Sequence, residues 1–260
     1  MPVSTFYAAI KHKNNKYADI ECRINQIFYD HKGRYGVRRI TMQLRNDGIL
    51  INHKTVHRLM KKLNLKSVQR RVKYNSYKGA VGKVAPNIIK RNFYAEKANQ
   101  KWATDVTQIN IGEKKLFLSP ILDMYNGEIV SYNISYRPDS EQVMDMLDKA
   151  FAKIPDGTNL IPHSDQGWLY QHIKYQERLK QKGIIQSMSR KGNCLDNSVM
   201  ENWFGIMKSE LLYPNKYNDP EVFKKDLMDY IEYYNNRRIK LKLKGLSPVQ
   251  YRTKSLMPSP

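Results

Sequence analysis

The chain has 260 residues, a hydrophobic fraction of 41% and a net charge of +21, which exclude a disordered chain and favour a folded protein with a polyanionic partner. Two cysteines are too few for a disulfide framework or a four-cysteine zinc site, and no apolar run approaches the length of a membrane span. The first residues lack the apolar core of a signal peptide, so we expect a cytoplasmic, nucleoid-associated protein with no membrane partner.

The positive charge is concentrated at one end of the chain. Residues 1–91 contain 21 Lys and Arg against 4 Asp and Glu, a net charge of +17, whereas residues 92–260 have a net charge of only +4. The first third therefore carries most of the attraction toward a polyanion such as nucleic acid. Composition alone also allows a generic basic protein or a ribosome-type binder.

Residues 18–65 are predicted to form three short helices, because apolar residues recur there at helical spacing. Asp47-Gly48 predicts a turn, and Asn52 is a suitable N-cap for the third helix. Basic side chains lie off the apolar stripe, as in a helix-turn-helix that enters a DNA major groove; a small helical bundle with a solvated basic face is the alternative. The side chains predicted to bind DNA in this region are Arg38, Arg39, His53, Lys54, His57, Arg58 and Lys61.

Residues 66–101 lack a long apolar face, since basic residues, glycines and Pro86 interrupt any period. This composition predicts an extended, positively charged linker that can follow a phosphate backbone. The predicted domains are a helix-turn-helix domain over 1–71, the linker over 72–101, an α/β core over 102–215, and a C-terminal helix with a basic tail over 216–260.

From Trp102 onward, strands alternate with helices. Segments rich in β-forming residues predict three antiparallel strands over 102–111, 116–124 and 128–136, the last two joined by a hairpin at Asn126-Gly127. Pro120 inside the second strand predicts an edge position or a bulge. The later elements are predicted as a helix over 140–152, a strand over 159–164, a helix over 170–182, a strand over 184–189, and helices over 197–212 and 220–236. This order predicts a mixed α/β sheet.

Three acidic residues stand where α/β proteins place functional side chains. Asp105 lies inside the first predicted strand, Asp165 directly follows a short apolar strand, and Glu201 lies in the first turns of a helix. Magnesium prefers hard oxygen ligands, and two such ions about 3.5–4 Å apart can activate the attacking and leaving oxygens of a phosphodiester. Any one acid alone would be read as a surface or salt-bridge residue. Together, the three are predicted to be catalytic and to bind metal.

Basic side chains accompany Glu201. Helical angles place Lys208, seven residues later, on the same non-core face, where it can contact a DNA phosphate. Arg190 and Lys191 add two cations just before the helix, and we predict that they also contact DNA. Asn197 either caps this helix or orients the site, and both interpretations stay open.

Four further positions have two interpretations each. His163 can polarise a metal-bound water or make a structural hydrogen bond, and the structural role is favoured. Asp123 is either an additional ligand or a structural residue, with the structural role again favoured. Arg237 and Arg238 either grip target phosphates or belong to a solvated basic tail over 237–254.

Taken together, these residues resemble the D-D-E pattern of transposases and retroviral integrases. Asp105 lies in WATDVTQ, Asp165 in HSDQGWLY, and Glu201 in SRKGNCLDNSVMENWFGIMKSELLY. The pattern includes the 35 residues between Asp165 and Glu201 and a lysine seven residues further on. The chain is similar to the second-frame (OrfB) proteins of insertion sequence family three, and further matching segments are 35–63, 85–93 and 230–251.

The resemblance implies a ribonuclease-H-like catalytic core with two magnesium or manganese ions, Asp105 bridging both while Asp165 and Glu201 each complete one site. It implies hydrolysis at the 3′ end of an insertion sequence and then strand transfer by the freed 3′-OH, with Lys208 near the transposon end. The implied partners are transposon-end and target DNA, further copies of the chain on paired ends, and an upstream-frame DNA-binding protein.

Two other functions stay open at this point. A catalytically inactive DNA-binding regulator of transposition would have a broken triad, whereas all three acids are present. A simple ribonuclease-H-like nuclease without strand transfer leaves the +17 charge of residues 1–91 unexplained.

Overall fold

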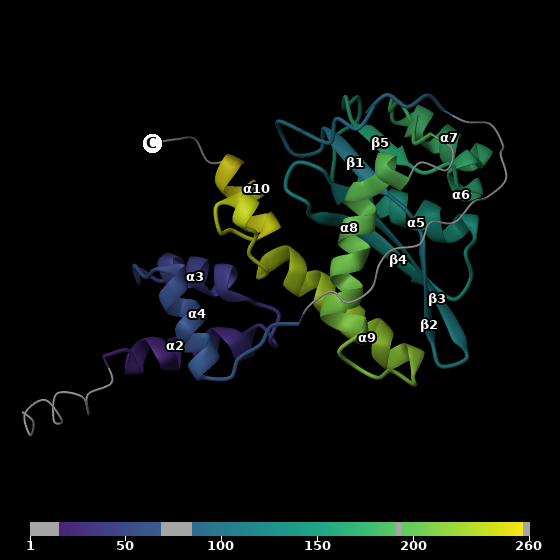
Figure 1. The fold of residues 1–260 in the computed structure, drawn as a ribbon. Coiled ribbons are helices and arrows are strands. Elements are labelled where there is room, and N and C mark those ends of the chain that lie inside the picture. Colours follow the sequence, from purple (N-terminus) through teal and green to yellow (C-terminus); the bar gives the residue numbers. More distant parts are fainter. Residues whose placement is uncertain (1–15, 69–84, 191–193, 257–260) are drawn as a thin grey trace, which may run out of the picture. The chain divides into compact units, whose positions relative to one another are not determined.

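The structure, a computed structural model, describes residues 16–68, 85–190 and 194–256 (Figure 1). The chain forms two compact units. The helical unit contains Met1–Val68 and Lys240–Gly245, and the sheet unit contains Gln69–Ile239 and Leu246–Pro260. Among the described helices, none is long and apolar enough to cross a membrane. The predicted division into four domains stays a prediction.

The helical unit contains the three helices that the sequence predicts: α2 (Ala18–Asp30), α3 (Val37–Asn46) and α4 (His53–Lys62). The predicted N-cap is confirmed, because the Asn52 side chain accepts a hydrogen bond from the Lys54 N–H at 2.8 Å. The apolar stripes meet in one small core, whose buried residues include Ile24, Ile27, Ile40, Leu44, Val56, Leu59 and Met60.

A distant segment completes the helical unit. Asn46, the last residue of α3, donates from Nδ2 to the carbonyl oxygen of Gly245 at 2.9 Å. Gly245 has a φ of +80°, and a Cβ atom at this position would lie 2.6 Å from Cγ of Met42. Only glycine suits both the left-handed backbone and this close approach.

The sheet unit is built on one six-stranded mixed sheet. Strands β1, β5 and β6 are parallel neighbours, whereas β2 and β4 pair antiparallel with β3, as does β1. The order is β2-β3-β1-β5-β6, with β4 also beside β3. The strand bounds are β1 Lys101–Thr104, β2 Thr107–Ile111, β3 Lys114–Asp123, β4 Ile129–Ser135, β5 Ile161–Ser164 and β6 Ser187–Met188.

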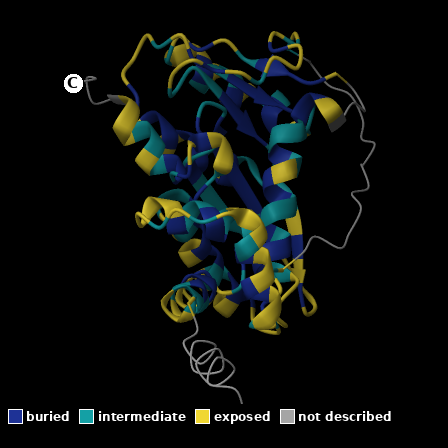
Figure 2. Cartoon of the chain, turned by 60° about the vertical axis from the view of Figure 1, so that its left-hand side comes forward, coloured by how far each residue is buried: buried dark blue, intermediate teal, exposed yellow. Residues whose placement is uncertain are grey.

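Helices cover both faces of this sheet. One apolar cluster joins the sheet to α8 (Ser198–Met207) and α9 (Pro220–Asn236), and a second joins it to α5 (Ser140–Phe151) and α7 (Ile173–Gln181). Neighbouring residues of β1 pack on opposite faces of the sheet: Ala103 belongs to the first cluster and Trp102 to the second. Figure 2 shows the strands mainly in the colour of buried residues. The remaining helices are α6 (Trp168–Gln171) and α10 (Pro248–Leu256).

The first predicted strand is divided in two. β1 ends at Thr104 and β2 begins at Thr107, so Asp105 lies in a break rather than inside a strand. The register is the same on both sides of the break, with Thr104 opposite Ile121 and Thr107 opposite Leu118. That register places Asp105 opposite Pro120, whose nitrogen has no hydrogen to donate to the ladder.

Pro120 itself does not lie at a sheet edge. It pairs with Tyr132 of β4 in an interior strand, so the edge interpretation is wrong. The bulge interpretation is confirmed, because the β3–β4 register shifts between Ile121 and Leu122. The predicted hairpin is also present, since β3 and β4 are antiparallel and Gly127 between them has a φ of +71°.

Two other predicted elements differ in detail. The helix predicted over 197–212 ends as α8 at Met207 and continues as a π-helical turn, Lys208–Leu212. The helix predicted over 170–182 is divided at His172, whose extended backbone separates α6 from α7. Of the predicted linker, residues 72–84 lie outside the described residues.

Candidate active site

Asp105 and Asp165 lie at the carboxyl ends of two neighbouring strands. β1 and β5 are adjacent and parallel, with Ala103 opposite His163, and each aspartate follows the last residue of its strand. The carboxyl ends of neighbouring parallel strands therefore bring together two acids that are 60 positions apart in sequence. Both side chains are half-buried.

Glu201 lies on helix α8, close enough to Asp105 for its charge to act on that residue. Just before the helix, Asn197 donates from Nδ2 to the carbonyl oxygen of Thr104, the last residue of β1, at 3.3 Å. Met200 and Trp203 are buried on the core side, whereas Glu201 is half-buried. The helix thus presents Glu201 on the non-core face that the sequence predicts.

The three carboxylates influence one another electrostatically. Burial raises the pKa of Asp105 well above its usual value, and the negative charges of Asp165 and Glu201 raise it further. The Val106 N–H and the charge of Lys208 lower this pKa, but they do not outweigh the other effects. Burial likewise raises the pKa of Asp165. The site therefore concentrates more negative charge than its own cations neutralise.

One oxygen of each aspartate is bound by its own loop. Asp105 Oδ1 accepts the Val106 N–H, and Asp165 Oδ1 accepts the Gly167 N–H, both at 2.8 Å. A Cβ atom at position 167 would lie 2.8 Å from Asp165 Oδ1. Glycine at this position therefore allows the loop to turn closely around the carboxylate.

Lys208 lies beside the acids, as predicted for a residue on the face of Glu201. Its Nζ donates to Thr107 Oγ1 at 3.1 Å. Burial lowers the pKa of Lys208, while the charge of Asp105 raises it. Lys208 begins the π-helical turn, a feature that is often found at functional sites.

Glu210 of the same π-helical turn forms a buried ion pair with Arg238, which corrects the prediction for Arg238. This residue is neither a phosphate contact nor part of a solvated tail, because only 2% of it is exposed. It donates to both carboxylate oxygens of Glu210, at 2.8 and 2.6 Å, and Tyr230 adds a third hydrogen bond. Arg237, by contrast, is exposed.

Tyr170 is a site residue that the sequence prediction missed. Its hydroxyl lies 3.2 Å from Thr104 Oγ1, next to the start of the Asp105 loop. Burial raises the pKa of Tyr170 well above its usual value, and the charges of Asp105 and Asp165 add to this effect. The only indication in the sequence is its place in the HSDQGWLY segment, five residues after Asp165.

Asp196 organises the loop that leads into α8. Its carboxylate accepts hydrogen bonds from Arg190, Arg91 and Asn87, and those from Arg190 and Arg91 lower its pKa. The Arg190 side chain nevertheless stays 60% exposed, as a DNA contact requires, and this role remains a prediction. Lys191, the other cation predicted there, lies outside the described residues.

His163 and Asp123 both have structural roles. His163 is fully buried between Ser187 Oγ and the carbonyl oxygen of Asp196, each 2.9 Å away, and burial lowers its pKa. Asp123 is 1% exposed and accepts the Asn99 and Tyr125 N–H groups. Burial raises the pKa of Asp123 to about 6. The structural interpretation that the sequence favoured is thus confirmed for both.

The predicted DNA-binding side chains of the helical unit lie on its surface. His53, Lys54, His57, Arg58 and Lys61 of α4 are all exposed. On α3, Arg38 is exposed, and Arg39 is half-buried and donates to the carbonyl oxygen of Arg34. Basic groups outside and apolar groups inside are the arrangement that the helix-turn-helix interpretation requires.

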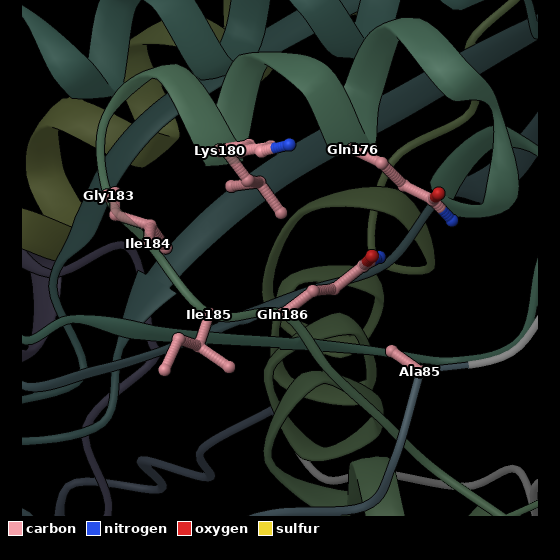
Figure 3. Close-up of a pocket in the computed structure, with 8 residues that line it drawn as sticks. Ala85, Gln176, Lys180, Gly183, Ile184, Ile185 and Gln186 are labelled. Atoms are coloured by element: carbon pink, nitrogen blue, oxygen red, sulfur yellow. The ribbon is translucent and has the colours of Figure 1, made fainter.

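A separate cavity of about 520 Å³ lies in the sheet unit and contains none of the predicted site residues (Figure 3). Its only charged lining residue is Lys180 on α7. The lining residues are Ala85, Gln176, Leu179, Lys180, Gly183, Ile184, Ile185 and Gln186.

Within residues 16–68, 85–190 and 194–256, no group of three or more His, Cys, Asp or Glu side chains is arranged to hold a metal ion. The predicted ligand roles of Asp105, Asp165 and Glu201 therefore rest on the chemistry of the donors. Carboxylate oxygens are the ligands that magnesium prefers. The repulsion that raises the pKa of Asp105 is the kind that a bound divalent cation relieves, so the donor set fits such an ion.

Known proteins match all of the regions described above. Models of the integrase core domain match residues 95–194 and 201–256, and a model of an HTH-like domain matches residues 15–73. The putative transposase InsK for insertion sequence element IS150, from Escherichia coli K12, is 49% identical over 260 residues, covering 99% of this chain and 92% of that protein. The transposase InsF for insertion sequence IS3A, from the same strain, is 32% identical over 231 residues, covering 88% of this chain and 80% of that protein.

The chain belongs to the insertion-sequence transposases of the IS150 and IS3 type. Among solved structures, a chain of the simian T-cell lymphotropic virus intasome matches this transposase with a TM-score of 0.53 at 16% identity. The match covers 92% of the transposase and 77% of that chain, and it concerns the fold alone. The predicted fold class is confirmed: a ribonuclease-H-like α/β core of the retroviral-integrase type, preceded by a helix-turn-helix region.

Proposed function

We propose that this transposase acts by D-D-E chemistry, with Asp105, Asp165 and Glu201 as its catalytic carboxylates. The observation that carries the proposal is the meeting of Asp105 and Asp165 at the ends of two parallel strands, where the charges of Asp165 and Glu201 raise the pKa of Asp105. A half-buried cluster of like charges is unfavourable for folding alone. Its presence at the carboxyl ends of two neighbouring strands points to a catalytic use.

The proposed reaction has two steps. Water first attacks the phosphodiester at the 3′ end of the element, and the bond from phosphorus to the 3′ oxygen breaks, which leaves a 3′-OH on the element. This 3′-OH then attacks a phosphodiester of target DNA, so that a new phosphorus–oxygen bond forms and the target's own 3′-OH leaves. Neither step needs a covalent bond between protein and DNA.

The carboxylates Asp105, Asp165 and Glu201 would hold magnesium or manganese, which when bound supplies charge stabilisation at the attacking and leaving oxygens. The chain's own residues position the DNA strand. Lys208 places an ammonium group beside Thr107 at the edge of the acid cluster, where it can bind a phosphate oxygen. Arg190, whose side chain is 60% exposed, would bind a further phosphate.

The helical unit would supply DNA affinity and orientation. Its exposed cations on α3 and α4 belong to the +17 region of the chain, and attraction of this kind binds phosphates of any sequence. Base recognition would come from α4, a short helix with an apolar inner face. Further copies of the chain are proposed as partners, because transposition joins two element ends.

The decisive experiment incubates the purified chain with labelled transposon-end DNA, target DNA and Mg²⁺. Joined products support the proposal. Binding without cleavage would instead indicate an inactive regulator, and cleavage of RNA–DNA hybrids alone would indicate a simple nuclease.

A matched pair of variants tests the site. Glu201→Gln keeps the shape of the side chain but removes its charge, so cleavage should fall by at least about 100-fold while DNA binding is kept. Glu177→Gln makes the same change at an exposed position on α7 and should leave cleavage unchanged. Full activity of Glu201→Gln would contradict the assignment.

A further inference from the structure

Two neighbouring residues at the start of α8, Asp196 and Asn197, form hydrogen bonds to β5 and β1. Asn197 donates from Nδ2 to the carbonyl oxygen of Thr104, directly before Asp105. The carbonyl oxygen of Asp196 lies 2.9 Å from Nε2 of His163, two residues before Asp165. The dipeptide therefore links the elements that carry Asp105 and Asp165 to the helix that carries Glu201.

Asn197 occupies the N-cap position of α8 but makes no side-chain capping bond to the helix. Asn52 shows the usual use of such a residue, since its side-chain oxygen accepts the Lys54 N–H at the start of α4. The amide of Asn197 instead reaches across to β1. Of the two interpretations that the sequence left open, orientation of the site is the one that fits these contacts.

The oxygen of the Asn197 side chain, Oδ1, argues against the view that Asn197 only stabilises the fold. Asn197 is 4% exposed, and its Oδ1 has no hydrogen-bond partner among the described residues. A buried acceptor without a partner costs free energy, because it has lost its bond to water. An apolar residue would avoid this cost, so what the amide adds at this position is the hydrogen bond to Thr104.

We propose that Asn197 is a positioning residue for metal binding: its hydrogen bond to the end of β1 fixes Glu201, one helical turn further on, relative to Asp105. This inference rests on the proposed function, since it assumes that the carboxylates bind a divalent cation. The carboxylate of Asp196, the neighbouring residue, accepts hydrogen bonds from Arg91 and Arg190. Groups that orient metal ligands in this way commonly change metal affinity by roughly 10–100-fold when they are removed.

The test measures binding of Mn²⁺ alone to the full-length, DNA-free protein, by titration calorimetry and by the metal-dependent rise in melting temperature. Asn197→Ala removes the bond to Thr104, and Asn197→Ser provides a second variant that suits an N-cap position. The control is Asn235→Ala, which removes two hydrogen bonds between α9 and Ile129 of β4, away from the acids.

We expect the Mn²⁺ concentration for half-saturation to rise roughly 10–100-fold in both Asn197 variants and to stay unchanged in Asn235→Ala. In the absence of metal, the control should melt at least as early as the Asn197 variants. The inference is overturned if the Asn197 variants bind Mn²⁺ as tightly as the control does.

Failure of the proposed function would look different. In that case the unmodified protein would bind no Mn²⁺, or Glu201→Gln would keep its cleavage activity, and both proposals would fall. If those two results are as expected while the Asn197 variants match the control, only the role of Asn197 is rejected. Should Asn197→Ala fold poorly, Asn197→Ser decides the question by the same criterion.

Discussion

Two aspartates near the proposed site, Asp105 and Asp196, lie in opposite electrostatic environments. Burial and neighbouring carboxylates raise the pKa of Asp105, whereas hydrogen bonds from Arg190 and Arg91 lower that of Asp196. A raised pKa means that the contribution of Asp105 to stability is present at low pH and is lost as pH rises through the raised value. For Asp196 the contribution is present at neutral pH and is lost on acidification.

Substitution by asparagine should therefore have opposite effects at the two positions. At pH 8 without metal, Asp105→Asn should raise the melting temperature, because it removes a repelled charge, and it should abolish cleavage. Asp196→Asn should lower the melting temperature, because it removes the negative charge that accepts the hydrogen bonds of Arg190 and Arg91. Adding Mg²⁺ should stabilise the unmodified protein but not Asp105→Asn. A lower melting temperature for Asp105→Asn would contradict the charge argument.

How far these residues could be predicted from the sequence depends on the range of the interactions involved. The position of Asp165 directly after a strand follows from a local pattern, so it was predictable. The break at Asp105 was not, because it depends on Pro120, which faces it from another strand. The burial of Arg238 likewise depends on Glu210, 28 residues away. Local charge alone made this arginine look like part of a solvated tail.

At the scale of elements, the π-helical turn contains Glu210, whose carboxylate pairs with the buried Arg238, and we expect this pair to stabilise the turn. Burial lowers the pKa of Arg238, but the hydrogen bonds and charge of Glu210 outweigh this and raise it. Arg238→Met would leave the Glu210 carboxylate buried without its partner, which costs about 3–5 kcal/mol. Urea unfolding should show this loss.

A matched variant is available at the next position. Arg237 is exposed, and interactions of exposed charges contribute at most about 1 kcal/mol, so Arg237→Met should lower the free energy of unfolding far less than Arg238→Met does. The double variant Glu210→Gln with Arg238→Met should recover part of the loss, because no unpaired charge remains. Equal effects at 237 and 238 would show that the pair does not stabilise the turn.

Helix α4 offers a second prediction at this scale. If Arg58 and Lys61 bind phosphates, replacing either by alanine should reduce the slope of log affinity against log salt concentration by about 1. Lys180→Ala, in the cavity on α7, removes the same charge outside the proposed DNA surface and serves as the control. An equal change of slope in the control would show that net charge alone, not the α4 surface, sets the salt dependence.

At the scale of the whole molecule, a contact that spans 199 positions closes the helical unit. Gly245→Ala should destabilise this unit for two reasons. A left-handed backbone costs an L-residue roughly 1–2 kcal/mol, and the new Cβ would lie 2.6 Å from Met42 Cγ. Gly157→Ala, with a φ of +69° and nothing within 4 Å, carries the backbone cost alone. The melting temperature should therefore fall further for Gly245→Ala than for Gly157→Ala. Equal decreases would exclude the packing effect.

Residues 240–245 complete a unit whose other members end at Val68. A polypeptide cut after Val68 would therefore lack the partner of Asn46 and leave the side of Met42 uncovered. Anyone who excises the N-terminal region to study DNA recognition should thus append the 240–245 peptide through a designed connection. Boundaries chosen from sequence order alone would yield a fragment that is less stable than the region is in the intact chain.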